Sequence, residues 1–200
     1  MEKVEVLRQY FGFSSFREGQ QTLIDAILAG RDVLGVMPTG GGKSLCYELP
    51  ALLLPGLTLV ISPLISLMKD QVMALQNAGI PAGCIHSAMS VEELREAYRD
   101  TRFGAYKILY IAPERLLTDG FCALAQELEI SLLAVDEAHC ISQWGQDFRP
   151  SYLKILDFLQ KLPRRPALAA FTATATAQVR SDIVRILQLQ DPVTVVTGFD

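Results

Sequence analysis

The sequence predicts an α/β protein, namely a three-layer α/β/α domain built on a doubly wound parallel sheet. Two patterns predict this class. Short apolar segments without polar alternation recur along the chain, and segments with helical periodicity separate them. Unbroken apolar strands are typical of parallel sheets that helices cover on both faces. The length agrees, because 200 residues, 50% of them hydrophobic, suffice for the core of one domain.

The individual elements follow from apolar runs, helical periodicity and end signals. Pro63 suits the first turn of a helix, and Ser90 with Glu93 forms a capping signature for the next one. Strands are predicted at 32–36, 57–61, 82–85, 107–111, 131–135, 167–171 and 193–196. Helices are predicted at 2–9, about 19–29, 45–54, 63–78, 90–101, 119–127, 152–162 and 176–187, with a short one near 113. No repeat or linker interrupts the alternation, so residues 1–200 are expected to form one domain.

The charge and the cysteine content limit how the chain can contact nucleic acid and whether it binds zinc. The net charge is −4, so any contact with nucleic acid is expected to be local, without a broad basic face. Cys46, Cys84, Cys122 and Cys140 are widely spaced and form no C-x-x-C pair. We therefore expect reduced, mostly buried thiols, as in a cytoplasmic protein, and no zinc in this chain.

One uncharged segment, residues 49–68, is long enough to span a bilayer. It is broken by Pro50, Pro55-Gly56 and Pro63, which indicates a helix end, a turn, a strand and a new helix start. The charged N-terminus does not resemble a signal peptide. We therefore expect a soluble protein that does not contact a membrane.

A glycine-rich loop follows the first predicted strand. Its sequence is Met37-Pro38-Thr39-Gly40-Gly41-Gly42-Lys43-Ser44, and a helix follows it. In a strand–loop–helix of this kind, glycine N–H groups and the helix N-terminus cradle a phosphate, the lysine reaches the β- and γ-phosphates, and the Ser hydroxyl ligates Mg²⁺. Met37 replaces the first glycine of the strict pattern, which favours the shortened form used by helicase-type ATPases. The alternative is a flexible glycine turn followed by a surface lysine.

Asp136-Glu137 directly follows the strand at 131–135. The first carboxylate can hold Mg²⁺, and the second can orient or deprotonate the water that attacks the γ-phosphate. Two solvated acids at a strand end would be the simpler explanation. The pairing with Gly42-Lys43-Ser44 favours the catalytic interpretation.

Residues 10–21 allow two interpretations. Four aromatic side chains occur between Tyr10 and Phe16, followed by Arg17 and two glutamines. The aromatics can form a hydrophobic staple for the helix at 19–29. Alternatively, an aromatic ring stacks on a nucleobase, and a glutamine amide pairs with adenine.

The candidate groups all follow predicted strands. Ligands of such sheets bind at the C-terminal ends of the strands. We therefore expect the glycine-rich loop, Ser62-Pro63, residues 112–115, Asp136-Glu137 and residues 172–174 to share one edge of the sheet.

In combination, these motifs resemble the first ATPase lobe of superfamily 2 helicases, and in detail the RecQ family of DNA helicases. The resemblance lies in Phe11-Gly12 with Phe16-Arg17 and Gln20, in the glycine-rich loop through Tyr47, in residues 62–71, and in Asp136-Glu137-Ala138-His139 running on to Arg149-Pro150. It implies a RecA-like P-loop NTPase domain and a 3′-to-5′ DNA helicase of recombination or repair, with ATP and Mg²⁺ as cofactors.

The resemblance also implies a role for each matching residue. Adenine is expected at Phe13, Arg17 and Gln20, and the phosphates at Thr39, Gly40, Gly41, Gly42, Lys43 and Ser44. Ser44 and Asp136 are expected to hold Mg²⁺, and Lys43, Asp136, Glu137 and His139 to act in hydrolysis. DNA contact or coupling is expected of Ser62, Lys69, Trp144, Phe148, Arg149, Thr172 and Thr174.

Two points limit what the resemblance implies. Gln146 stands where RecQ relatives usually carry histidine, and a neutral amide can hydrogen-bond but cannot gain a proton near neutral pH. The chain also ends at Asp200, where a second lobe with its arginine finger is expected, so we expect DNA and that lobe as partners. The alternatives are an ATP-binding module with negligible hydrolysis of its own, or the lobe of an RNA helicase.

Overall fold

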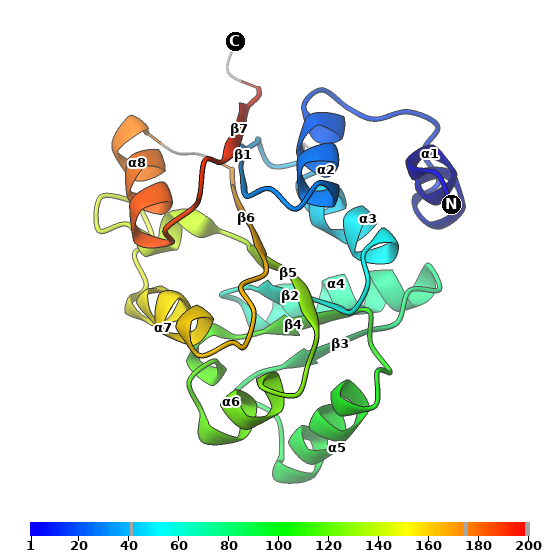
Figure 1. Cartoon of the computed structure of the whole chain (residues 1–200), viewed down its shortest axis with the longest axis vertical. Helices are drawn as coiled ribbons and strands as arrows, with labels where there is room; N and C mark the ends of the chain where they lie inside the picture. The colour runs from blue at the N-terminus through cyan, green and yellow to red at the C-terminus, as the bar shows by residue number, and fades with distance from the viewer. Residues whose placement is uncertain (41, 174–175, 199–200) are drawn as a thin grey trace.

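A computed structural model describes residues 1–40, 42–173 and 176–198. Its centre is a seven-stranded sheet in the order β3-β4-β2-β5-β6-β1-β7, and every pair of neighbouring strands is parallel. The predicted doubly wound parallel sheet is therefore confirmed (Figure 1). The strands are β1 (Val33–Val36), β2 (Leu57–Ile61), β3 (Ala82–Ile85), β4 (Ile108–Ile111), β5 (Ile130–Val135), β6 (Ala167–Thr172) and β7 (Val193–Val196).

Helices connect these strands and cover both faces of the sheet. The α-helices are α1 (Lys3–Val6), α2 (Gln20–Leu28), α3 (Leu45–Leu53), α4 (Ile65–Asn77), α5 (Val91–Arg102), α6 (Asp119–Ala125), α7 (Lys154–Gln160) and α8 (Ala177–Ile186). Shorter helical segments are η1 (Leu7–Phe11), η2 (Pro113–Arg115), η3 (Ala138–Ile141) and η4 (Pro150–Leu153).

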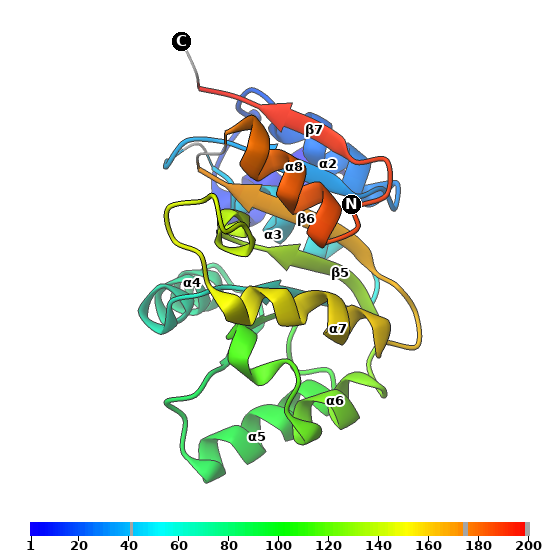
Figure 2. The ribbon, with the colours of Figure 1, turned by 90° about the vertical axis from the view of Figure 1, so that its left-hand side faces the viewer.

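The core consists of one apolar layer on each face of the sheet. On one face, Leu59 and Leu133 of the central strands belong to a cluster with residues of α5 to α8, including Phe121 and Phe158. On the other face, Val60 lies in a cluster with residues of α2, α3 and α4. Figure 2 shows α7 and α8 in front of the strands and α2 and α3 behind them. This two-sided cover explains why the strand sequences are unbroken apolar runs.

The structure confirms the predicted capping signature of α5, whereas the prediction for Pro63 was wrong, because α4 begins at Ile65 after Leu64 and Pro63 lies before the helix. Ser90 Oγ caps α5 by accepting a hydrogen bond from Glu93 N at 3.1 Å, and the Glu93 carboxylate accepts one from Ser90 N at 3.3 Å. Thr176 caps α8 through Val179 N at 3.2 Å. Both helices therefore begin where local side-chain chemistry satisfies their free N–H groups.

The predicted helix at 2–9 was wrong in its form. The structure has one turn of α-helix, α1, continued by a π-helical turn, η1, which ends at Gly12 with a φ of +75°. The predicted helix at 152–162 also begins differently, because η4 precedes α7 at residues 150–153. The 3-10 turn η3, after Asp136-Glu137, was not predicted.

The structure also shows the state of the cysteines and the fold of the uncharged segment. All four cysteines are free, with Cys46 and Cys140 buried and Cys84 and Cys122 half-buried. Residues 49–68 form the end of α3, a turn, β2 and the start of α4, as predicted. Within the described ranges, no helix combines the length and the apolar character that a bilayer crossing requires.

Candidate functional site

The loops that carry the candidate residues meet at the C-terminal edge of the sheet, as expected. Backbone bonds extend the strand ladders into them. Met37 N donates to Thr172 O at 3.0 Å, and Asp136 N donates to Ile61 O at 2.9 Å. Ser62 N donates to Ile111 O at 3.2 Å. The side chains after β1, β2, β5 and β6 are thereby held close to one another.

A cavity of about 690 Å³ opens at this edge. It brings together the predicted adenine-binding and phosphate-binding residues and the two acids. The predicted residues that line it are Phe13, Arg17, Gln20, Thr39, Gly40, Gly42, Lys43, Ser44, Asp136 and Glu137. Gly41 was also predicted here but lies outside the described residues.

The glycine-rich loop has the backbone that its sequence predicts. Gly40 and Gly42 have φ values of +83° and +77°, in the left-handed region that favours glycine. At Gly42, a Cβ atom would lie 2.3 Å from Nε2 of Gln20, so a side chain here would displace the Gln20 amide. Ser44, the last residue of the loop, directly precedes the first residue of α3. The loop therefore lies against the N-terminal end of this helix.

Gln20 and Arg17 contact the glycine-rich loop directly. Gln20 Nε2 donates to Gly42 O at 3.2 Å, and Gln20 Oε1 accepts from Arg17 N at 2.7 Å. The Arg17 guanidinium donates to Gly40 O. Both sides of the Gln20 amide thus have protein partners, although the side chain also lines the cavity. In this conformation, a base has access only to the second N–H and the second lone pair of the Gln20 amide, unless these bonds exchange.

The two acids after β5 differ in environment. Burial raises the pKa of Asp136 to about 6, and the Glu137 carboxylate acts in the same direction, whereas the Glu137 N–H and the charge of Lys43 lower it. Glu137 is half-buried and has a φ of +51°, which is uncommon for a residue with a side chain. Its N–H donates to Asp136 Oδ1 at 2.9 Å. Such backbone conformations occur frequently at functional sites.

A third acid, Glu48, lines the same cavity and was not predicted as a site residue. It lies on α3 and is 6% exposed, and its carboxylate accepts a hydrogen bond from Tyr110 Oη at 3.3 Å. Burial raises the pKa of Glu48 to about 7; the Tyr110 bond opposes this rise and the Asp136 charge adds to it. The signal in the sequence was an acid inside the apolar helix that follows Ser44.

His139 connects the acids to the strand end at Thr172. Its Nδ1 lies 2.8 Å from Thr172 Oγ1 and 3.4 Å from a Glu137 carboxylate oxygen. The structure therefore joins the predicted catalytic and coupling residues at this point. Thr174, the other predicted coupling residue of this segment, lies outside the described residues.

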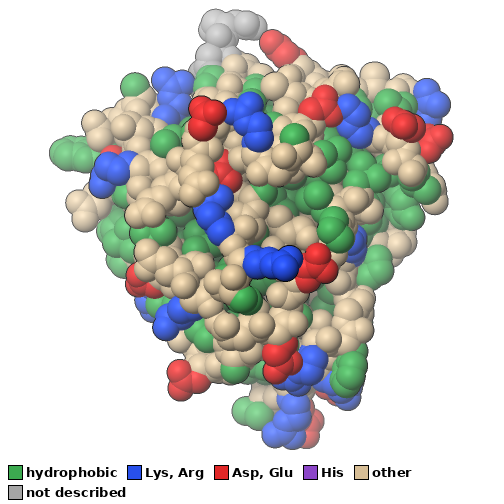
Figure 3. Space-filling model, in the orientation of Figure 1, with side chains coloured by type: hydrophobic (Ala, Val, Ile, Leu, Met, Phe, Trp, Pro, Cys, Tyr) green, Lys and Arg blue, Asp and Glu red, His purple; other side chains and the backbone are tan. Residues whose placement is uncertain are grey.

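The remaining predicted residues lie outside the cavity. Trp144 is 75% exposed and lies on the loop at residues 142–149, with Phe148 and Arg149, which are partly buried. The end of this loop is fixed, because Arg149 N donates to Cys140 O at 2.8 Å. Lys69 is exposed on α4, whereas Ser62 is 1% exposed at the end of β2. Lysine, arginine and acidic side chains are interspersed on the face shown in Figure 3.

The donor set of the cavity fits a phosphate group with a divalent cation. The ammonium of Lys43 and the glycine N–H groups suit an anion. The hydroxyl of Ser44 and the carboxylates of Asp136 and Glu137 suit Mg²⁺, which prefers oxygen ligands. A volume of about 690 Å³ is within the usual range of cofactor sites.

One further group of possible metal ligands occurs among the described residues. His139, Cys140 and Asp147 place ligand atoms within 4.8 Å of one another. Burial raises the pKa of the Cys140 thiol to about 12.

The arrangement has counterparts among known proteins. The chain is 50% identical to the ATP-dependent DNA helicase RecQ of Bacillus subtilis over 97% of its length, and 48% identical to that of Pasteurella multocida over 98%. It spans about one third of the length of these relatives, 33% and 31% respectively. The predicted resemblance to RecQ helicases is therefore confirmed over nearly the whole chain.

Solved structures confirm the fold. A hypothetical ATP-dependent RNA helicase from Sulfolobus tokodaii superposes with a TM-score of 0.74 at 21% identity, covering 96% of this chain and 56% of that one. The DUF1998 helicase MrfA gives a TM-score of 0.76 at 18% identity, covering 99% and 33%.

The family profile of the DEAD/DEAH box helicases matches residues 17–183. This range includes the glycine-rich loop, the acids after β5 and the start of α8. The chain therefore belongs to the DEAD/DEAH box helicase family.

Proposed function

We propose that this chain is the N-terminal ATP-binding lobe of a RecQ-type DNA helicase that moves 3′ to 5′ along single-stranded DNA in recombination or repair. The observation that carries the proposal is the cavity that joins Lys43 and Ser44 to Asp136 and Glu137. The names of the RecQ relatives, all DNA helicases, support the choice of substrate.

Some residues of the cavity bind the nucleotide and its metal ion, and others act in hydrolysis. Lys43 and the glycine-rich loop bind the phosphates, and Ser44 and Asp136 hold Mg²⁺. When bound, the metal ion neutralises charge on the phosphate oxygens. Glu137 orients the attacking water and accepts its proton, and its distance of 3.4 Å from His139 links this step to Thr172.

DNA contact is proposed for the surface outside the cavity. Trp144 stacks on a base of the DNA. An exposed indole gains free energy from such stacking whichever base is present. Arg149 and Phe148 contribute charge and apolar surface on the same loop, and Lys69 contributes charge on α4. A second lobe of the same protein completes the nucleotide site and supplies the arginine finger.

The first experiment tests the nucleotide site. Lys43→Ala is expected to abolish ATP-dependent DNA unwinding by the complete protein, because the β- and γ-phosphates lose their cation. Lys161→Ala, which removes an exposed lysine just after α7, is the matched control and should unwind normally. Unwinding by the Lys43→Ala protein at the wild-type rate would refute the assignment.

The second experiment tests the substrate. Single-stranded DNA is expected to stimulate ATP hydrolysis by the complete protein far more than single-stranded RNA of the same sequence. Equal stimulation by both, or a preference for RNA, would favour the RNA-helicase alternative.

A further inference from the structure

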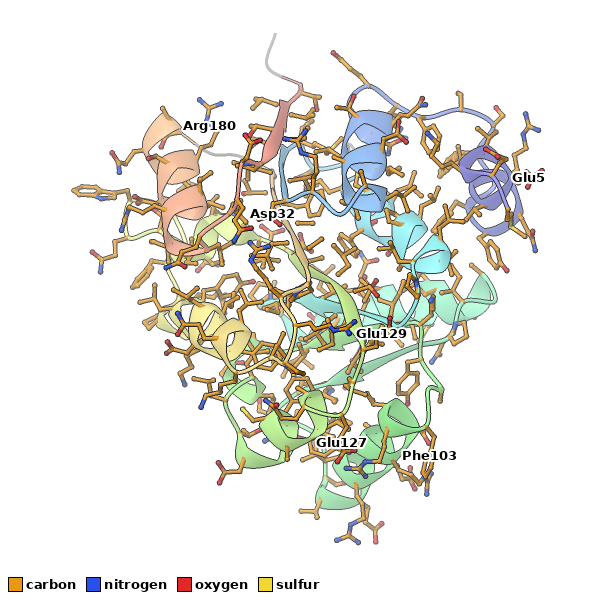
Figure 4. The ribbon with its side chains drawn as sticks, in the orientation of Figure 1. Glu5, Asp32, Phe103, Glu127, Glu129 and Arg180 are labelled. Carbon is orange, nitrogen blue, oxygen red and sulfur yellow. The ribbon has the colours of Figure 1, made fainter. Side chains whose placement is uncertain are left out.

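A buried carboxylate outside the nucleotide cavity joins α8 to the loop at residues 142–149. Asp182 is 4% exposed and lies on α8, the helix on which Figure 4 labels Arg180. Asp182 Oδ2 accepts a hydrogen bond from Ser142 Oγ at 2.8 Å. Asp182 Oδ1 accepts bonds from Gln178 Nε2 and from the Arg185 guanidinium, both at 3.1 Å. Neither the cavity nor the proposed hydrolysis uses this group.

The Ser142 hydroxyl is hydrogen-bonded both to Asp182 and to the backbone of the loop. Ser142 is fully buried, and because its hydrogen points to Asp182, its lone pairs remain free to accept. They accept Trp144 N at 3.1 Å, and Ser142 O accepts Gly145 N at 3.2 Å. The first turn of the loop is thus built on one serine, and α8 fixes that serine. The chain runs beside α8 here (Figure 1).

The contact is charged and specific. The Ser142 bond lowers the pKa of Asp182 against the opposing effect of burial, and the bonds from Arg185 and Gln178 add to it. Asp182 is therefore ionised near neutral pH. A hydrogen bond to a buried charge is stronger than a neutral one, and it constrains the position of both partners.

The loop combines a hydrogen-bonded backbone with an exposed ring. The Trp144 side chain is 75% exposed, although the backbone N–H of Trp144 donates to the hydroxyl of the buried Ser142. At Gly145, a Cβ atom would lie 2.8 Å from His139 O, so the chain passes close to η3. The position of the indole therefore depends on the buried bonds of its backbone, and a loop without them would have to become ordered during binding.

We propose that Asp182 is a positioning residue for DNA binding: through Ser142 it holds the Trp144 loop in its binding geometry and joins this loop to α8. The inference rests on the proposed function, in which Trp144 stacks on single-stranded DNA. One link to this loop runs from Thr172 through His139 and η3, and Asp182 adds a second link, which joins the loop to α8.

Tryptophan fluorescence provides a direct test, because Trp144 is the only tryptophan in the 200 residues. Ser142→Ala and Asp182→Ala are each expected to lower the fluorescence anisotropy of Trp144. They are also expected to weaken the binding of a single-stranded oligothymidylate about tenfold, which corresponds to the loss of one charged hydrogen bond. The combined variant should bind no more weakly than Ser142→Ala, because both changes remove the same contact.

Two matched controls separate this contact from the general stability of α8. Gln178→Ala and Arg185→Ala each remove one hydrogen bond to the same carboxylate but leave the Ser142 bond in place. Both should keep the anisotropy and the DNA affinity of the wild type. Equal losses in the controls and in Ser142→Ala would overturn the proposal. Should Asp182→Ala fail to fold, Ser142→Ala with the two controls decides the question.

Failure of this inference is distinguishable from failure of the proposed function. Wild-type fluorescence that does not respond to single-stranded DNA would contradict the DNA-binding role of Trp144, and the anisotropies would then decide the positioning role alone. A wild-type response that Ser142→Ala and Asp182→Ala reproduce, with unchanged anisotropy, would overturn the positioning role and leave the proposed function intact.

Discussion

At the scale of single residues, Asp32 shows how one buried charge holds three strands together. It precedes β1, and its carboxylate accepts bonds from the Arg165 guanidinium at 2.6 and 3.1 Å, from Gln190 N at 2.7 Å and from Leu168 N at 3.0 Å. Arg165 and Gln190 lie in the connections that lead to β6 and β7, and Asp32 is labelled in Figure 4. Burial raises the pKa of Asp32, but these bonds together outweigh it and lower the pKa below its ordinary value.

The Asp32 carboxylate should therefore make stability fall in acid. Its folded pKa lies below its unfolded value, so its contribution is complete above the unfolded pKa and is lost as the pH falls through the folded pKa. Asp32→Ala is expected to cost about 2–4 kcal/mol of unfolding free energy at pH 7, because the N–H groups of Leu168 and Gln190 lose their acceptor and Arg165 loses its counter-charge. Urea unfolding from pH 7 to pH 3 measures both effects. The variant should show a smaller decline in acid than the wild type, and parallel curves would contradict this role.

Glu48 should have the opposite effect on the pH dependence of stability, because its pKa is raised and that of Asp32 is lowered. Its folded pKa of about 7 is above its unfolded value, so the folded protein loses stability as the pH rises between about 4.5 and 7. Glu48→Gln keeps the shape and the acceptor for Tyr110 without the buried charge. We expect the variant to be more stable than the wild type by up to about 3 kcal/mol at pH 8 and equal to it at pH 4. Thermal unfolding at the two pH values measures this difference. A variant of lower stability at pH 8 would show that the charge itself is needed.

Gln20 combines two roles that one variant can separate. Gln20→Ala is expected to weaken ATP binding relative to GTP, because the amide suits adenine. It should also weaken both nucleotides to some extent, because the bond to Gly42 O is lost. Competition binding with ATP, GTP and triphosphate compares the three ligands. Equal losses for ATP and GTP would contradict the adenine role, whereas an unchanged affinity for triphosphate would contradict the role in the glycine-rich loop.

At the scale of elements, the sequence predicted what local rules determine. Apolar runs located every strand, and the serine and glutamate at 90 and 93 located the start of α5, because both signals act within a few residues. The π-helical turn at 7–11 and the 3-10 turns η3 and η4 were missed. Their form depends on contacts made elsewhere, such as the bond of 2.8 Å from Tyr152 Oη to Asp136 O, which joins residues 16 positions apart.

The candidate site shows the same division. Lys43, Ser44, Asp136 and Glu137 could be predicted because strand ends of a parallel sheet meet at one edge. Glu48 and Asp182 were not predicted, because only the packing of distant segments gives each its buried partners, although Glu48 is an acid within an apolar helix. The bonds of Gln20 to the glycine-rich loop were likewise invisible in the sequence.

The capping box of α5 gives a prediction at this scale. Ser90→Ala is expected to lower the unfolding free energy by about 1 kcal/mol, because Glu93 N loses its acceptor. Ser90→Asp, which keeps an acceptor, should retain most of the stability. Amide exchange at the start of α5 measures the local effect, and equal exchange in Ser90→Ala and the wild type would contradict it. Nucleotide binding should not change, because α5 lies on the far side of the sheet from α3.

At the scale of the whole molecule, the described residues form one nucleotide cavity, and the proposed function requires a second lobe to complete it. The cavity supplies Lys43, Ser44 and the acids. In related phosphoryl-transfer enzymes, an arginine finger contributes about 10³ to 10⁵ in rate, and the resemblance to RecQ helicases assigns it to the second lobe. The 200-residue chain alone should therefore bind ATP with Mg²⁺ and hydrolyse it very slowly.

Measuring binding and turnover on the same sample tests this prediction. Titration with a fluorescent ATP analogue and Mg²⁺ should show saturable binding that Lys43→Ala abolishes and Lys161→Ala retains. Phosphate release by the isolated chain should stay near background, both with and without single-stranded DNA. Fast DNA-stimulated release would show that these 200 residues contain a complete catalytic site. Absence of binding in the wild type would instead show that the second lobe is needed to form the nucleotide site, because the cavity on this lobe alone would then not suffice.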